Sequence, residues 1–205
     1  MFRRIFPPLV AADFLGTMLL PLSAEASSTP GGPSGSTSSS LPAGVVAIPM
    51  TAAVATAVKN LGNGTSGLIY SNGQTITVPT SVASKVVVHS GPTPDNTVYG
   101  NCGDSYLYLN KNGSTGVWGY VGYDVFASSV GGVLSFEFAV STDNTTYSIG
   151  QTNVWDGPTS KLSWIQDFYE NAGPGLYESH VITGHVIGWK NTCFSGDPNS
   201  RIMTP

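Results

Sequence analysis

The chain has 205 residues, a length that allows one domain with appendages or at most two small domains. Only 10% of its residues are charged, against about 25% in an average soluble domain, and the formal net charge is -4. No cluster of Lys and Arg follows Arg3 and Arg4, which disfavours nucleic acid and anionic lipid as partners, because both are bound by several basic groups on one face.

The N-terminus has the pattern of a secretory signal peptide over Met1–Ala26. Two arginines provide the positive start, Phe14–Leu22 is mostly apolar, and Ala24-Glu25-Ala26 offers small residues for cleavage. An aspartate and two prolines interrupt the apolar region, which leaves a structural or disordered N-terminus as the alternative. We expect a secreted, extracellular protein that begins near Ser27 and has no membrane span in its mature part, since no later stretch approaches about 20 apolar residues.

The following segment, Ser27–Gly44, is rich in Ser, Gly and Pro and has no apolar periodicity. It is predicted to be a disordered linker, because it cannot bury enough apolar surface to order itself. A single β domain is predicted for residues 45–205. Near its start, Thr51–Leu61 is the candidate for one short helix, because three apolar side chains fall on one helical stripe.

Strands and turns are predicted for the rest of the domain. Asn72-Gly73 lies between the alternating runs Leu68–Ser71 and Gln74–Val78 and predicts a tight hairpin with a type I′ turn. The other predicted strands are separated by turn-rich strings and are Lys85–Ser90, Ser105–Asn110, Val117–Phe126, Val133–Ser141, Thr146–Thr152, Leu162–Tyr169 and Tyr177–Trp189. Short strands without intervening helices predict an all-β fold, an antiparallel β-sandwich of immunoglobulin-like or jelly-roll-like type.

Strand alternation assigns side chains to faces, because residues i and i+2 share one side of a sheet. The predicted core positions are Leu107, Leu109, Leu134, Phe136, Phe138 and Val140. Four aromatic residues would share an outer face if their strands are neighbours, and we treat them as candidate binding residues: Tyr106, Tyr108, Trp118 and Tyr120. Such a platform can stack on sugar rings or pack against a protein, and it can equally be a second covered face.

The chain has two cysteines, Cys102 and Cys193. In an exported chain they are most simply paired as a disulfide, because the compartment is oxidising and no further ligands stand at metal-binding spacing. Cys102-Gly103-Asp104-Ser105 contains Gly-Asp-Ser, as in the nucleophile block of some secreted esterases. No histidine three residues after an aspartate accompanies it, so we interpret Gly103-Asp104 as a turn leading into a strand.

Histidines and carboxylates give weaker signals for chemistry. Glu178 and His180 share a strand face and could form an acid–base or ligand pair, with an exposed polar pair as the favoured alternative. His185 is predicted on the opposite face from His180, unless a bulge intervenes at Gly184. Asp167 and Glu170 are predicted to be surface charges, and neither a metal nor a cofactor is expected.

The second half of the chain contains several short motifs, namely Asn101-Cys102-Gly103, Tyr106-Leu107-Tyr108-Leu109, Phe136-Glu137-Phe138, Gly184-His185-Val186, Thr192-Cys193 and Asp197-Pro198. With these motifs the chain resembles small, uncharacterised secreted β-domain proteins of actinobacteria. The resemblance covers roughly residues 98–205. It implies an extracytoplasmic β domain with this disulfide, and it implies no activity.

The sequence therefore favours an exported binding or surface-interaction module over an enzyme. Cell-wall glycan and another extracellular protein are the two partner classes that the composition leaves open. One alternative is a secreted hydrolase that uses Glu178, His180 or Asp104, and another is a structural component of the envelope.

Overall fold

The computed structural model describes residues 45–89 and 102–205, all of which belong to one compact unit. The predicted signal peptide Met1–Ala26 and linker Ser27–Gly44 lie outside these ranges. Within the ranges, no helix is both long enough and apolar enough to cross a bilayer.

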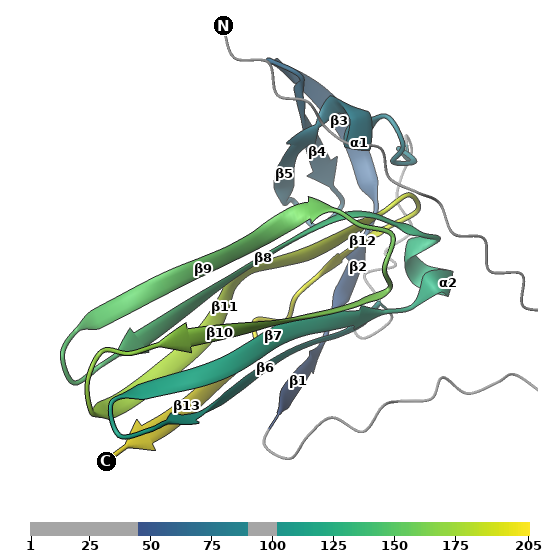
Figure 1. Cartoon of the computed structure of the whole chain (residues 1–205). Helices are drawn as coiled ribbons and strands as arrows, with labels where there is room; N and C mark the ends of the chain where they lie inside the picture. The colour runs from purple at the N-terminus through teal and green to yellow at the C-terminus, as the bar shows by residue number, and fades with distance from the viewer. Residues whose placement is uncertain (1–44, 90–101) are drawn as a thin grey trace, which may run out of the picture. The chain divides into compact units, whose positions relative to one another are not determined.

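Strands make up most of the described chain, with two short helices between them (Figure 1). The helices are α1 (Thr80–Ala83) and α2 (Ala127–Val130). In chain order the strands are β1 (Val46–Pro49), β2 (Thr51–Ala53), β3 (Ala55–Gly62), β4 (Thr65–Tyr70), β5 (Thr75–Pro79), β6 (Gly103–Asn112), β7 (Gly116–Val125), β8 (Val133–Asn144), β9 (Ile149–Pro158), β10 (Ser163–Glu170), β11 (Gly175–Gly188), β12 (Thr192–Phe194) and β13 (Asn199–Thr204).

Two antiparallel sheets pack face to face, which confirms the predicted β-sandwich. The first sheet has the order β1-β6-β7-β10, and the second has the order β2-β12-β11-β8-β9, with β13 also paired to β11. Their inner faces share one core that contains Leu107 and Leu109 from the first sheet and Phe136, Phe138 and Val140 from the second. These are five of the six predicted core positions, as strict alternation along β6 and β8 requires.

The sixth predicted core residue, Leu134, packs elsewhere. Val133 pairs with Gly188 and Ser135 pairs with Ile187, so Leu134 is an extra residue on β8. Such a bulge reverses the alternation. It places Val133 in the sandwich core, and Leu134 packs against a second apolar cluster instead.

A third sheet, β3-β4-β5, builds that second cluster. Its buried residues Leu68 and Tyr70 belong to one cluster with Ile187 and Phe194 of the second sheet. The Tyr70 hydroxyl lies 2.9 Å from the Thr192 hydroxyl, and the Tyr70 ring meets Phe194 edge-on at 5.2 Å. The small sheet therefore packs on the outer side of the second sheet.

The helix predicted for Thr51–Leu61 is wrong, because this segment forms β2 and β3. β2 pairs with β12 and β3 pairs with β4. Ala53 and Ala55 are buried, whereas Val58 and Leu61 of the supposed helical stripe are exposed. A helix of this length is marginal by itself, and pairing with the distant β12 and with the adjacent β4 overrides its weak propensity.

The hairpin around Asn72-Gly73 is confirmed as β4 and β5, but its turn differs from the predicted type I′. Only Gly73 has a positive φ, of 83°. Its N–H donates to the Tyr70 carbonyl at 3.0 Å, and the Tyr70 N–H donates to the Gln74 carbonyl at 2.9 Å. This is a three-residue connection in which a turn is followed by a left-handed glycine, the second common solution for a hairpin.

Two predicted strands need correction. Lys85–Ser90 is not a strand, because within its described part only Val88 makes an isolated bridge, to Ala55. The strand predicted for Thr146–Thr152 begins at Ile149 instead. Ser148 has a φ of 53°, so the preceding residues form the turn from β8.

Candidate functional site

The four predicted aromatic binding residues lie together on the outer face of the first sheet. β6 and β7 pair so that Tyr108 stands opposite Tyr120 and Tyr106 stands opposite Gly122. The rings of Tyr108 and Tyr120 stack with centroids 5.0 Å apart, and Trp118 meets Tyr108 edge-on at 5.5 Å. Strand pairing and alternation thus bring the four rings into one cluster.

Within this cluster, two rings support the other two. Tyr106 and Tyr120 are only 4% and 6% exposed, whereas Tyr108 and Trp118 are half-buried. The Tyr106 ring covers Gly122, where a Cβ atom would come within 2.6 Å of it. Burial raises the pKa of Tyr106 and Tyr120, so their hydroxyls stay neutral. Because these two rings are buried, Tyr108 and Trp118 are the rings that can contact a partner.

Strand β10 extends the aromatic face with residues that the sequence analysis did not select. Tyr169 stands opposite Trp118, Asp167 opposite Tyr120, and Ile165 opposite Gly122. Tyr169 is 62% exposed and Ile165 is 55% exposed. Alternation along Leu162–Tyr169 would have placed these three side chains on one face, but it could not show that β10 is the neighbour of β7.

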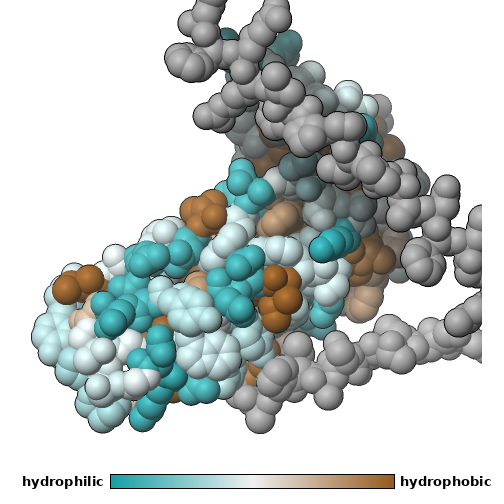
Figure 2. Space-filling model, viewed as in Figure 1, coloured by the Kyte–Doolittle hydropathy of each residue, from teal (hydrophilic) through white to brown (hydrophobic). Residues whose placement is uncertain are grey.

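We use the term aromatic face for Tyr106, Tyr108, Trp118, Tyr120, Ile165, Asp167 and Tyr169. In Figure 2, side chains of intermediate hydropathy gather over β7 and β10, with strongly hydrophilic side chains beside them. The Tyr120 hydroxyl is buried in this face and has no hydrogen-bond partner among the described residues. The face therefore combines exposed ring surface with an unused polar group.

The carboxylates of Asp167 and Glu170 do not act as a pair. An odd separation along β10 turns Asp167 to the aromatic face and Glu170 to the inner face. Glu170 is buried, and its Oε2 has no hydrogen-bond partner among the described residues. Burial, followed by the nearby charge of Asp143, raises its pKa, so the prediction of a surface charge is wrong for Glu170.

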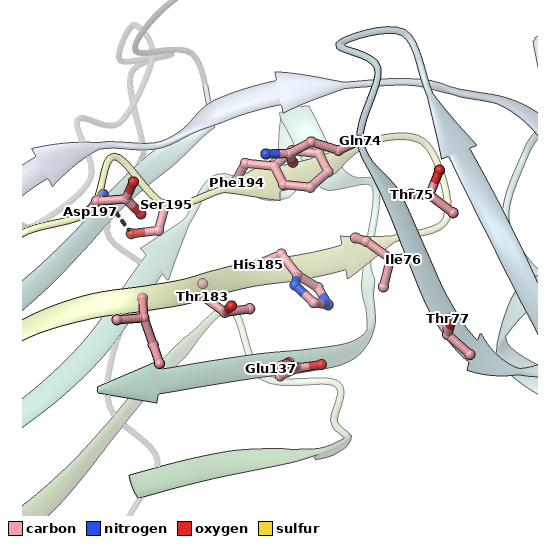
Figure 3. A pocket seen from close by; sticks show the side chains of 12 residues that line it. Gln74, Thr75, Ile76, Thr77, Glu137, Thr183, His185, Phe194, Ser195 and Asp197 are labelled. Carbon is pink, nitrogen blue, oxygen red and sulfur yellow. Dashed lines mark hydrogen bonds between the residues drawn. The ribbon is translucent and has the colours of Figure 1, made fainter. Parts of the chain in front are cut away.

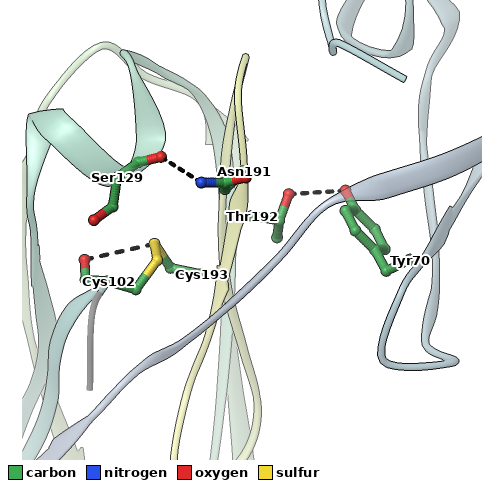
Figure 4. Close-up of a disulfide and its surroundings, with 6 residues drawn as sticks. All are labelled: Tyr70, Cys102, Ser129, Asn191, Thr192 and Cys193. Carbon is green, nitrogen blue, oxygen red and sulfur yellow. Dashed lines mark hydrogen bonds between the residues drawn. A yellow bond between two sulfur atoms is a disulfide. The ribbon is translucent and has the colours of Figure 1, made fainter. Parts of the chain in front are cut away.

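The predicted disulfide between Cys102 and Cys193 is confirmed (Figure 4). Both cysteines are fully buried, and their Cα atoms are 5.6 Å apart. Cys102 immediately precedes β6 of the first sheet, and Cys193 lies in β12 of the second. The bond therefore joins the two sheets of the sandwich through its core.

The Gly-Asp-Ser string has a structural role in the described chain. Gly103 and Asp104 are the first residues of β6 and pair with β7, so they belong to the strand itself and not to a turn before it. Ser105 is buried, and its hydroxyl lies 2.8 Å from the Ser195 hydroxyl. The hydroxyl also lies 3.4 Å from the Ile48 carbonyl oxygen, so its partners stabilise the packing of β1 and β6 against the loop after β12.

The arrangement of the two histidines on β11 corrects the sequence prediction. Val181 pairs with Val140 and Thr183 with Ala139, so Ile182 is an extra residue and the alternation reverses there. His180 and His185 consequently share the outer face of the second sheet. Glu178 forms an ion pair with Arg201 at 2.9 Å, and among the described residues no cluster of three His, Cys, Asp or Glu side chains could hold a metal.

A polar pocket of about 500 Å³ lies on this outer face, beside β5 (Figure 3). One wall is a row across neighbouring strands, in which His185 stands opposite Glu137 of β8 and Phe194 of β12. The opposite wall is the run of β5 and its turn, residues 74–77. Residues 182–184 of β11, together with Ser195 and Asp197, complete the lining. Sequence reasoning missed this pocket, because its walls come from four distant segments.

His185 is the titratable group most affected by this environment. It is 6% exposed, and burial lowers its pKa from 6.5 to about 4. The imidazole is therefore neutral at pH 7, with one nitrogen that donates a hydrogen bond and one that accepts.

This shift predicts that the protein loses stability as the pH falls from 7 to 5. The unfolded state binds a proton at His185 below a pH of about 6.5, while the folded state resists protonation down to about 4. The expected loss in the free energy of unfolding is about 2 kcal/mol between pH 7 and pH 5. Urea unfolding of the wild type and of His185→Gln at both pH values measures it.

The His185→Gln variant should remove most of this slope, whereas His180→Gln, which changes an exposed imidazole, should retain it. The raised pKa values of Asp197 and Glu170 act in the opposite direction, because those carboxyls hold protons more tightly when folded. Glu170 is the same in all three proteins and cancels in the comparison. Asp197 is retained in all three, but His180→Gln removes the nearby imidazole charge that lowers the pKa of Asp197. Equal slopes in the wild type and His185→Gln would contradict the prediction.

Comparison of the chain with protein-family models, with curated proteins and with solved structures gives no match. The resemblance to actinobacterial secreted proteins therefore stays a prediction, and the aromatic face and the pocket are interpreted from their own geometry.

Proposed function

We propose that this chain is an exported binding module that holds an extended, uncharged polymer, of the kind found in cell-wall glycan, on its aromatic face. The observation that carries the proposal is the row of accessible rings across three adjacent strands. Tyr108 of β6, Trp118 of β7 and Tyr169 of β10 all contribute ring surface. Adjacent strands are about 4.8 Å apart, so the rings span roughly 10 Å, enough for a disaccharide.

The polar groups of the face support a sugar over a wholly apolar partner. Asp167 lies between the strand positions of Ile165 and Tyr169, where its carboxylate can accept hydrogen bonds from sugar hydroxyls. Aromatic rings with a few convergent polar groups are the usual composition of a site for a neutral polar ligand. The low content of charged residues agrees with a partner that is recognised without ion pairs.

Export is supported by two independent features. The first is the signal-peptide pattern of Met1–Ala26. The second is the disulfide between Cys102 and Cys193, a bond that persists in oxidising compartments and is rare in the cytosol.

Replacing Tyr169 by Ala is expected to weaken retention on insoluble cell-wall polysaccharide about tenfold, because one exposed stacking ring contributes on the order of 1.4 kcal/mol. The thermal midpoint should stay near that of the wild type, since Tyr169 is 62% exposed. Trp118→Ala should weaken retention as well, but it will also cost some stability because the ring packs on Tyr108. Pull-down with the purified variants measures retention.

The matched control is Tyr147→Ala, which removes a 50% exposed tyrosine from the turn between β8 and β9. It should retain full binding. Unchanged retention in both Tyr169→Ala and Trp118→Ala, with the wild type bound, would show that the polymer binds elsewhere and would overturn the proposal.

A further inference from the structure

The pocket beside His185 has a chemical character different from that of the aromatic face. Among the described residues that line it, Glu137 and Asp197 carry carboxylates and none is Lys or Arg. His185 adds no positive charge at pH 7, because burial lowers its pKa to about 4. The potential in the pocket is therefore negative, and it favours a cation.

The remaining lining offers hydrogen bonds and one apolar surface. Figure 3 shows Ile76 of β5 across the pocket from His185, with Thr183 near His185 on β11. Thr75 and Thr77 alternate with the buried Ile76 along β5, so their side chains lie on the other face of that strand. Phe194 and Ile76 contribute apolar atoms from the cluster beneath the small sheet. A volume of about 500 Å³ lies within the usual range for sites that enclose small molecules.

Asp197 lies at the edge of the pocket, in the loop after β12. Its φ of 57° is in the left-handed region, which few residues other than glycine adopt. Its N–H donates to the Ser195 hydroxyl at 3.1 Å, and that hydroxyl lies 2.8 Å from the Ser105 hydroxyl.

We propose that this pocket binds a compact polar molecule through a primary ammonium group, with the carboxylates of Glu137 and Asp197 as the source of the attraction and the Thr183 hydroxyl as a further acceptor. Two sources offer this chemistry, an amino sugar and a lysine-type side chain. This second site is independent of the polymer site, because it lies on the other sheet of the sandwich.

Isothermal titration of the full chain at pH 7 tests the proposal with three probes. They are glucosamine, glucose, in which a hydroxyl replaces the amine, and Nα-acetyl-lysine amide. We expect at least one of the two amines to bind at least tenfold more tightly than glucose. Preference for glucosamine identifies an amino sugar as the source, and preference for the lysine derivative identifies a peptide side chain.

Two variants locate the binding. Glu137→Gln and Asp197→Asn should each weaken binding of the preferred amine about tenfold. Asparagine also tolerates a positive φ, so Asp197→Asn should keep the backbone. The control is Asp167→Asn, which removes one exposed carboxylate from the aromatic face and should leave amine binding unchanged.

The proposal is overturned if neither amine binds at millimolar concentration, if glucose binds as tightly as glucosamine and the lysine derivative does not bind, or if both pocket variants bind like the wild type. Retention on polysaccharide is measured on the same variants. It should be unchanged in Glu137→Gln and Asp197→Asn, so the outcome for this pocket is read separately from the outcome for the aromatic face.

Discussion

Replacing both Cys102 and Cys193 by Ala is expected to lower the free energy of unfolding by about 4 to 5 kcal/mol. The bond closes a sequence separation of 91 residues, and without it the unfolded chain regains the freedom that this loop removes. The loss is comparable to much of the stability of a small domain, which is typically about 5 to 15 kcal/mol. Urea unfolding of the oxidised wild type and of the double variant measures the difference.

The control is the wild type unfolded in the presence of a reductant, which should match the double variant within about 1 kcal/mol. Agreement would assign the loss to the covalent bond, because reduction leaves both side chains in the core. A loss below about 1 kcal/mol in both experiments would show that the two sheets hold together without this connection.

Replacing Tyr177 by Phe is expected to cost about 2 to 3 kcal/mol, although only one oxygen atom is removed. The Tyr177 hydroxyl accepts a hydrogen bond from the Ala172 N–H at 2.8 Å and approaches the Thr115 and Gly173 carbonyl oxygens at 2.8 Å each. It thereby joins the turn after β6 to the loop before β11. Since Tyr177 is fully buried, water cannot replace the lost partner of the Ala172 N–H.

Denaturant unfolding of Tyr177→Phe is compared with that of Tyr169→Phe. The comparison separates the loss of the buried hydrogen bonds from the general effect of removing a tyrosine hydroxyl. Tyr169 is 62% exposed, so its variant should stay within about 0.5 kcal/mol of the wild type. A similarly small change in Tyr177→Phe would mean that the neighbouring hydrogen bonds of Asn144 to Ala172 and Gly173 are enough to hold these loops.

The class of fold follows from local patterns in the sequence. Two strands show apolar residues that alternate with polar or outward-facing ones: Leu107 and Leu109 on one strand, and Phe136 and Phe138 on the other. Strands with one apolar face can bury that face only by packing against another sheet. The disulfide was predicted from the number of cysteines and from the expectation that the chain is exported. The shared face of Tyr106 and Tyr108, and that of Trp118 and Tyr120, followed from parity within each strand, because parity depends only on the strand being regular. The pairing of β6 with β7 then joined the two pairs.

The pairing of strands in the tertiary structure decided which segments form strands and which face of a sheet a side chain occupies after a bulge. Thr51–Leu61 became β2 and β3 because β12, far along the chain, pairs with β2, and β4, the next strand, pairs with β3. The bulge at Ile182 moved His185 to the same face as His180, since one extra residue reverses every later side chain. Local alternation carries no information on such an insertion.

The aromatic face was partly predicted from the sequence, whereas the pocket was revealed only by the tertiary structure. Four rings of the aromatic face were found from the sequence, but Tyr169 and Asp167 joined them only when β10 paired with β7. The pocket could not be found from the sequence at all, because the β3-β4-β5 sheet must first pack over the second sheet before Glu137, His185 and Asp197 line one cavity. A sequence determines side-chain parity locally, whereas a cavity is made by packing between distant segments.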